Sequence, residues 1–249
     1  MPLISYQKYD VIVYSSHKTA TMSILETLRR NGYSATHIHT YENNNWGCDD
    51  MLRFLKWHAE THGRINLVSV LRDPLDRLRS SFFQLYHTDE MNYFGTPEYD
   101  TTIMKTDIEA LHSMFDKSIQ TVKNTDAFGR DYGAYVFKAY RESLTEIGHM
   151  IGANIFDTMV RTEYGYFFSH DLFNLYVFDF DQVIRDMSLI ESALQLQLPI
   201  KCSSNLSSDK ASYEKYTQFE QIQIADDRIS NIRCYFADVI RALDRMRTV

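Results

Sequence analysis

The stretch that decides the fold runs from Tyr9 to Gly32 and reads YDVIVYSSHKTATMSILETLRRNG. It begins with the apolar run Val11–Tyr14, continues through a polar segment, and ends in Thr21–Arg30, where the apolar residues follow helical spacing. Gly32 stands where the C-terminus of a helix favours glycine. The stretch therefore predicts a strand over residues 9–14, a short loop, and a helix over Thr21–Arg30.

A strand, a polar loop with a lysine and a helix together indicate a site for an anion. The N-terminus of a helix presents N–H groups and the positive end of the helix dipole, and Lys18 adds a full charge. A P-loop that wraps the phosphates of a nucleotide has the form Gly-x-x-x-x-Gly-Lys-Ser/Thr, whereas Ser15–Thr21 contains no glycine. The loop is expected to hold a different anion, and an ordinary polar connection is the alternative.

The rest of the chain continues the alternation of strand and helix patterns. Further strands are predicted over residues 34–40, 64–71, 164–168 and 174–180, and helices over 49–62, 73–86, 107–123, 183–196 and, with a break, 213–243. Residues 87–106 indicate a loop or lid, and 132–150 is ambiguous. Such alternation is typical of the α/β class. We expect a single domain over residues 1–249, with a central parallel sheet, a P-loop-like strand–loop–helix core, flanking helices and helical insertions.

The composition limits the class of protein. The chain has 249 residues, of which 44% are hydrophobic and 24% charged, as in globular proteins. Its net charge of −7 argues against nucleic-acid binding, which needs a basic face. The three cysteines are scattered and indicate a reducing compartment, and no window is apolar enough to span a membrane. We therefore expect a cytoplasmic protein without a transmembrane segment; the sequence does not indicate its oligomeric state.

A second polar motif follows the strand predicted over residues 64–71. The stretch RDPLDRLRSSFF places Arg72 at the carboxyl end of this strand, the edge where open α/β sheets bind ligands. Asp73 and Pro74 form a favourable helix start. Ser80 lies eight residues after Arg72, two helical turns along, and could stand beside an anion that Arg72 holds. A strand-end ion pair and a solvated serine are the alternative.

Together the two motifs resemble those of the sulfotransferases that use 3′-phosphoadenosine 5′-phosphosulfate (PAPS). In that family an element similar to Pro-Lys-Ser/Thr-Gly-Thr-Thr binds the 5′-phosphosulfate, and Arg-x-Pro-x-x-Arg-x-x-Ser-x-Tyr/Phe binds the 3′-phosphate. HKTATMS matches the first element at Lys18, Thr19 and Thr21 and departs from it at His17, Ala20 and Met22. The form LRDPLDRLRSSF looks most like the carbohydrate sulfotransferases, and Asn205–Tyr216 is similar to a loop of bacterial capsule-type enzymes.

The resemblance implies a PAPS donor and a set of residues that bind it. These donor-binding candidates are Ser16, His17, Lys18, Thr19, Ala20, Thr21, Met22, Arg72, Ser80 and Lys210. It implies a donor-binding core over residues 9–86, and an acceptor or lid region with C-terminal helices over 87–249. The acceptor would be a carbohydrate or glycolipid, in polysaccharide biosynthesis in the bacterial cytoplasm or at the inner membrane. No metal is required, because Lys18 and the helix N-terminus supply positive charge.

Catalysis by sulfuryl transfer also needs a base that deprotonates the acceptor hydroxyl. His37 and His39 alternate along one predicted strand and so project to one face. The ordinary pKa of histidine suits a base near neutrality. Lys18, His39 and His37 are therefore the catalytic candidates; His39 is preferred because it is nearest the carboxyl end, and Glu42 ranks third.

Two other functions fit parts of the sequence. His37, His39, His58 and His62 could bind zinc, as in a zinc-dependent hydrolase or a zinc-stabilised domain. The chain could also be an inactive nucleotide-binding protein that keeps Arg72 and Ser80 without turnover. Metal content separates the first from a sulfotransferase, and activity separates the second.

Overall fold

The computed structural model describes residues 5–16, 19–39, 47–87, 115, 142–196, 213–221 and 223–248, without the side chains of 81–87 and 213–215. It forms two compact units. The first comprises Met1–Arg72, Arg141–Asn205 and Arg241–Val249, and the second comprises Asp73–Tyr140 and Leu206–Ile240. The division of the chain into one domain, with its core at residues 9–86, stays a prediction.

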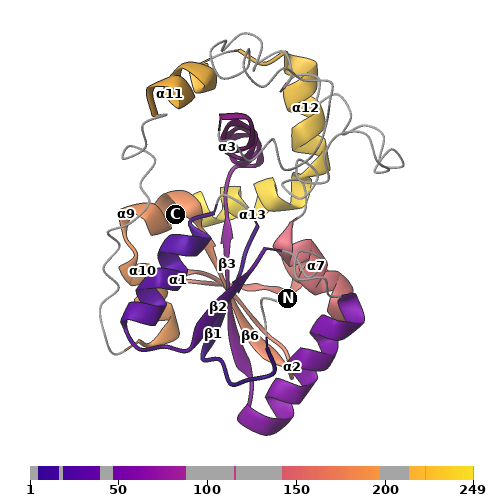
Figure 1. Cartoon of the computed structure of the whole chain (residues 1–249). Helices are drawn as coiled ribbons and strands as arrows, with labels where there is room; N and C mark the ends of the chain where they lie inside the picture. The colour runs from indigo at the N-terminus through magenta and orange to yellow at the C-terminus, as the bar shows by residue number, and fades with distance from the viewer. Residues whose placement is uncertain are drawn as a thin grey trace. The chain divides into compact units, whose positions relative to one another are not determined.

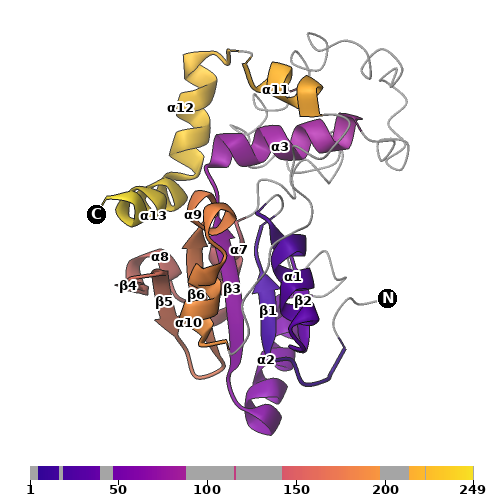
Figure 2. The same cartoon turned by 90° about the vertical axis from the view of Figure 1, so that its left-hand side faces the viewer.

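The first unit contains a six-stranded sheet (Figure 2). In spatial order the strands are β2 (Ala35–Ile38), β1 (Val11–Tyr14), β3 (Ile65–Leu71), β6 (Phe173–Asp179), β5 (Gly165–Ser169) and β4 (Val160–Thr162). The first four are parallel to one another, while β5 and β4 are each antiparallel to their neighbour. The predicted α/β class is therefore confirmed, and the sheet, predicted to be parallel, is mostly parallel, with β5 and β4 as antiparallel strands at one side. The parallel strands bring their carboxyl ends to one edge.

Helices cover both faces of this sheet (Figure 1). One face carries α1 (Thr21–Arg30), α9 (Phe180–Arg185) and α10 (Ser188–Leu194), and the other carries α2 (Cys48–His62) and α7 (Ser143–Ile151), which is followed by the short α8 (Ile155–Thr158). The core on the first face is aliphatic. Ile24, Leu25 and Leu28 of α1 are buried in it, as their helical spacing predicts.

The ends of α1 follow from local sequence. Past its C-terminus, Gly32 takes φ +83°, its N–H bonds to the Arg29 carbonyl, and the N–H of Tyr33 bonds to the Leu28 carbonyl. This pair of bonds is the Schellman arrangement, which glycine favours because it has no Cβ to clash in the left-handed region. The predicted end of the helix at Gly32 is confirmed.

The second unit contains α3 (Pro74–His87), α11 (Tyr213–Gln221), α12 (Asp226–Tyr235) and the first residues of α13 (Ala237–Arg247). The start of α3 is as predicted, because the Asp73 carboxylate accepts the N–H groups of Leu75 (2.9 Å) and Asp76 (3.2 Å). The last residues of α13 belong to the first unit, where the Arg247 guanidinium pairs with the buried Asp179 at 2.7 Å.

Three elements differ from the sequence prediction. The helix predicted over 183–196 is broken into α9 and α10, because the Asp186 carboxylate accepts the Ser188 N–H at 3.0 Å and starts a new helix there. Strand β4 was not predicted, since its three exposed residues show no alternation. Within the ambiguous segment, the described part forms α7.

No helix in the described part of the chain is long and apolar enough to cross a membrane. Two of the three cysteines are described, and both Cys48 and Cys234 are free thiols.

Candidate active site

The loop that follows β1 is anchored on the neighbouring strand by a buried serine. The hydroxyl of Ser15 accepts the Val70 N–H at 2.9 Å and lies 3.1 Å from the Val70 carbonyl. The regular pairing of β1 with β3 ends earlier, at Val13 and Val68, so this side chain extends the contact of the two strands. The Ser15 hydroxyl also lies 2.7 Å from the hydroxyl of Thr19. The entrance to the loop is thereby fixed against β3.

The exit from the loop forms the N-terminus of α1. Thr19 donates its hydroxyl to the Ser16 carbonyl at 2.6 Å, and Ala20 then takes φ 59° and ψ 18°, in the left-handed region. The first hydrogen bond of the helix runs from the Ile24 N–H to the Ala20 carbonyl. The helix therefore leaves the N–H groups of its first turn directed past its N-terminus, and Ala20 has no polar side chain to cap them. This geometry suits an anion.

The strain at Ala20 predicts a stabilising substitution. An L-residue in the left-handed region costs about 1–2 kcal/mol in steric strain. Glycine avoids this strain, but its greater conformational freedom in the unfolded chain makes folding less favourable by about 0.4–1 kcal/mol. Ala20→Gly is therefore expected to raise the free energy of unfolding by roughly 0.5–1 kcal/mol and Tm by about 1–4 °C. The matched control, Ala59→Gly inside α2, should lower it by about 0.5–1 kcal/mol. A lower Tm for Ala20→Gly in thermal melts would contradict the argument.

Ser16 ties the loop to α7. Its hydroxyl donates to the Glu142 carboxylate at 3.1 Å and accepts the Ser143 N–H at 3.1 Å, and all three residues are buried. The hydroxyl proton is thus directed at Glu142. Ser16 as a donor-binding residue stays a prediction, and the structure adds a second role in holding the loop.

A second buried carboxylate, on α7, bonds to the last residue of β1. Glu146 accepts the hydroxyl of Tyr14 at 2.8 Å, and the hydroxyls of Ser69 and Ser143 lie 3.0 Å apart. Polar groups buried in this way are strengthened by one another and fix a single arrangement. Sequence analysis missed Glu142 and Glu146, because they lie in the ambiguous segment; their spacing of four residues before an apolar run was the available signal.

His39 lies at the carboxyl edge of the sheet, beside the anion loop. Its Nδ1 is 3.0 Å from the Ser15 carbonyl, and because that carbonyl can only accept, Nδ1 carries the proton of the neutral ring. Nε2 then holds the lone pair that a base requires. The ring of His37, on β2, lies 5.2 Å from the ring of His39, which follows the strand. Burial, and secondarily the charge of Arg29, lower the pKa of His37.

The four histidines do not form the zinc site that the sequence allowed. The ring of buried His58 is held by the main chain, with Nδ1 donating to the Gly63 carbonyl (3.0 Å) and Nε2 accepting the Tyr9 N–H (3.2 Å). The ring of His62 meets that of His58 edge-on at 5.3 Å, and both lie on α2, whereas His37 lies on β2. In the described part of the chain, which includes all four, no three potential metal ligands come together. The predicted four-histidine zinc site is wrong, because both ring nitrogens of His58 are hydrogen-bonded to the main chain.

Arg72 follows the last residue of β3, as predicted, and is half-buried. Its guanidinium carbon lies 4.4 Å above the ring of Phe180, a contact that holds a planar cation in place. Ser80 is buried on α3, in the second unit. Arg72 belongs to the first unit and Ser80 to the second, so the joint binding of one phosphate by these two residues stays a prediction.

Arg77 of the same motif was not singled out from the sequence. It is the largest side chain that is fully buried in the described residues, and its guanidinium lies 5.2 Å from the ring centre of Phe236. A buried arginine on an aromatic face stabilises the packing of its own unit. The signal in the sequence was its place next to the apolar Leu78, because the aliphatic part of an arginine side chain can pack among apolar residues.

Several predicted residues and segments lie outside the described part of the chain. They are His17, Lys18, Glu42, Lys210, the lid predicted over 87–106 except for residue 87, and the helix predicted over 107–123 except for residue 115. Among the remaining donor-binding candidates, Thr19 and Thr21 are buried, and Met22 is exposed on the first turn of α1. The described candidates of the first unit thus group at the carboxyl edge of the parallel strands.

Comparisons with known proteins give one kind of likeness. No family model matches the chain, and no curated protein matches its sequence. Its structure is similar in outline to the crystal structure of a sulfotransferase from Alicyclobacillus acidocaldarius, with a TM-score of 0.49, 9% sequence identity and 96% of each chain covered. We draw no functional argument from a likeness of this degree, and the proposal below depends on the residues of this chain.

Proposed function

We propose that this chain is a PAPS-dependent sulfotransferase that transfers a sulfuryl group to a hydroxyl of a carbohydrate or glycolipid. The observation that carries the proposal is the convergence of three groups at one edge of the sheet. These are the N-terminus of α1 behind the left-handed Ala20, the His39 ring held by the Ser15 carbonyl, and Arg72 at the end of β3. An anion-binding helix start, a base and a second cation are what this donor and reaction need.

The donor carries negative charge at two places. The phosphosulfate would lie against the N-terminus of α1, where Lys18, Thr19 and Thr21 match the motif that binds it in the family. The 3′-phosphate would be bound by Arg72, with Ser80 in support. A guanidinium binds a phosphate through two parallel hydrogen bonds, so Arg72 would distinguish this donor from a plain adenosine 5′-phosphate.

Transfer then requires removal of one proton and stabilisation of one leaving group. His39 Nε2 would accept the proton of the acceptor hydroxyl as its oxygen forms a bond to sulfur, while the bond from sulfur to the 5′-phosphate oxygen breaks. Negative charge grows on that leaving oxygen, and Lys18 with the helix N-terminus would stabilise it. Positive charge from the chain itself serves in place of a metal ion.

Calorimetric titration with adenosine 3′,5′-bisphosphate, adenosine 5′-phosphate and ATP–Mg²⁺ tests the donor site. The bisphosphate is expected to bind tightest, and Arg72→Gln should weaken it by about tenfold to a hundredfold, the range for a lost hydrogen bond to a charged group. The same variant should leave the affinity for adenosine 5′-phosphate unchanged. No preference for the bisphosphate would overturn the proposal, and equal losses for both ligands would remove Arg72 from the 3′-phosphate.

The same titration bears on the inactive nucleotide-binding alternative. Such a protein would prefer the bisphosphate and yet show no PAPS turnover with carbohydrate hydroxyls. The cytoplasmic location and the bacterial polysaccharide role stay predictions from the sequence.

A further inference from the structure

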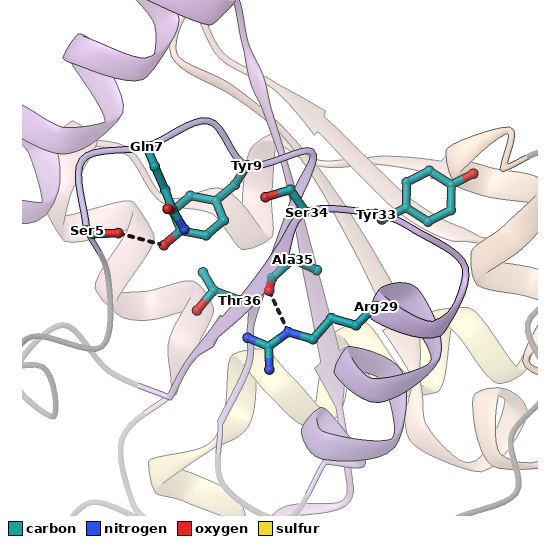
Figure 3. A pocket seen from close by; sticks show the side chains of 8 residues that line it. All are labelled: Ser5, Gln7, Tyr9, Arg29, Tyr33, Ser34, Ala35 and Thr36. Carbon is teal, nitrogen blue, oxygen red and sulfur yellow. Dashed lines mark hydrogen bonds between the residues drawn. The ribbon is translucent and has the colours of Figure 1, made fainter.

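A pocket of about 400 Å³ lies at the amino end of β2, away from the edge with His39 (Figure 3). Its walls come from the segment before β1, the start of β2 and the end of α1. Polar side chains on these walls are those of Ser5, Gln7, Tyr9, Arg29, Ser34 and Thr36. The ring of Tyr33, which also lines the pocket, points away from the others in Figure 3.

The lining has the chemistry of a saccharide site with one anionic group. Of the eight described residues that form it, Arg29 is the one that carries a charge, and hydroxyls and an amide make up most of the rest. Hydroxyl and amide groups both donate and accept, as sugar hydroxyls require. An arginine adds planar recognition of a carboxylate.

The side chain of Arg29 is hydrogen-bonded to the main chain of β2. Its Nε donates to the Ala35 carbonyl at 2.9 Å, and Figure 3 shows its guanidinium beneath Ala35 and Thr36. The contact fixes the plane of the guanidinium and leaves the two Nη groups as the donors that a carboxylate would use.

Neighbouring charges do not reverse the sign of this site. The carboxylate of Asp10 accepts the Ser34 N–H at 2.8 Å and lies 4.0 Å from the ammonium of Lys8. The exposed Arg30 pairs with Glu26 at 3.6 Å on the same helix. Among the described residues, the carboxylates of Asp10 and Glu26 therefore each lie beside a cation other than Arg29.

The pocket lies at the amino end of β2, and the candidate base His39 follows the carboxyl end of the same strand. β2 runs from Ala35 to Ile38, three steps that cover roughly 10 Å at 3.3 Å per residue, and His39 is the next residue. His37 lies between Ala35 and His39, close enough to Arg29 for the guanidinium to lower its pKa and 5.2 Å from the ring of His39. Among the described strands β2 is at the edge of the sheet, and a chain of sugars would lie along this edge.

We propose that the pocket binds a carboxylate-bearing sugar unit of the acceptor, with Arg29 on the carboxylate, so that a hydroxyl of a later unit reaches His39. The proposal rests on the proposed function and names its acceptor class: an acidic oligosaccharide that occupies the edge of β2.

Isothermal titration with a hyaluronan tetrasaccharide, whose alternate units are uronates, tests this site, with neutral chitotetraose as the matched ligand. The protein is expected to prefer the hyaluronan fragment. Arg29→Gln should weaken its binding by about tenfold, as for one lost charged hydrogen bond, because glutamine can still donate to the Ala35 carbonyl. Arg30→Gln, one residue along and exposed, should leave the affinity unchanged.

Binding of adenosine 3′,5′-bisphosphate to the same variants separates the two proposals. Both variants are expected to keep the affinity of the unchanged protein. If the bisphosphate binds and the tetrasaccharide shows no preference over chitotetraose, or no dependence on Arg29, the acceptor pocket is overturned and the donor site stands. If the tetrasaccharide binds through Arg29 and the bisphosphate does not bind, the saccharide pocket stands without a sulfotransferase.

Discussion

Replacing His39 by alanine is expected to lower turnover by about 10²–10⁴-fold, the usual contribution of a positioned general base. The reason is the fixed orientation of the ring. Nδ1 bonds to the Ser15 carbonyl at 3.0 Å, so Nε2 is the nitrogen that can take the proton of an acceptor hydroxyl. Ser15 is itself anchored on β3, and the base is thus held by the same strand ends that form the anion loop.

Steady-state kinetics with PAPS and an acidic oligosaccharide measures the effect, and the affinity for adenosine 3′,5′-bisphosphate is the control on folding. That affinity should stay unchanged, because His39 is assigned to the acceptor proton. His37→Ala is the matched variant, because the ring of His37 lies 5.2 Å from the ring of His39. If His37→Ala causes the large loss and His39→Ala does not, the base is His37. If neither variant loses turnover, neither histidine is the base.

The elements near the N-terminus could be predicted because their local signals agree with their packing. The helix over Thr21–Arg30 has the predicted bounds, since apolar spacing, loop and terminal glycine all indicate the same ends. The α3 start is equally local, with Asp73 as the cap. The parallel order of β2, β1 and β3 follows from alternation with helices that cross over the sheet.

The antiparallel pairing of β5 with β6 was not predicted from the sequence. Strands β5 and β6 were predicted with nearly their observed bounds, and they are joined by three residues, His170 to Leu172. So short a connection fits antiparallel neighbours, because parallel strands need a crossover of a dozen residues or more. The antiparallel edge of the sheet was thus available in the loop length, and the sequence analysis did not use it.

The contacts of the buried carboxylates at the start of α7 were beyond a local reading of the sequence, although their spacing was visible. Glu142 and Glu146 contact Ser16 and Tyr14, more than 120 residues earlier, and only the folded chain brings them together. The same holds for His58, whose helical spacing with His62 suggested a metal ligand, while its ring nitrogens bond to the main chain at Gly63 and Tyr9. Long-range hydrogen bonds of this kind leave no periodic pattern.

Lys18→Ala is expected to reduce turnover by about 10²–10³-fold, as the removal of one group that stabilises charge on a leaving oxygen does. The argument comes from the described residues on either side of the lysine. Ser16 is bound to Glu142 and Ser143, and Thr19 is bound to Ser15 and to the Ser16 carbonyl. These contacts do not involve the ammonium group, so the substitution should leave the loop anchors and the fold in place.

A second substitution tests whether the lysine acts through its charge. Lys18→Arg is the charge-preserving control; it should restore part of the rate, since a guanidinium supplies the charge on a different geometry. Near-normal turnover of Lys18→Ala would remove the lysine from the mechanism and assign stabilisation of the leaving group to the N-terminus of α1 alone.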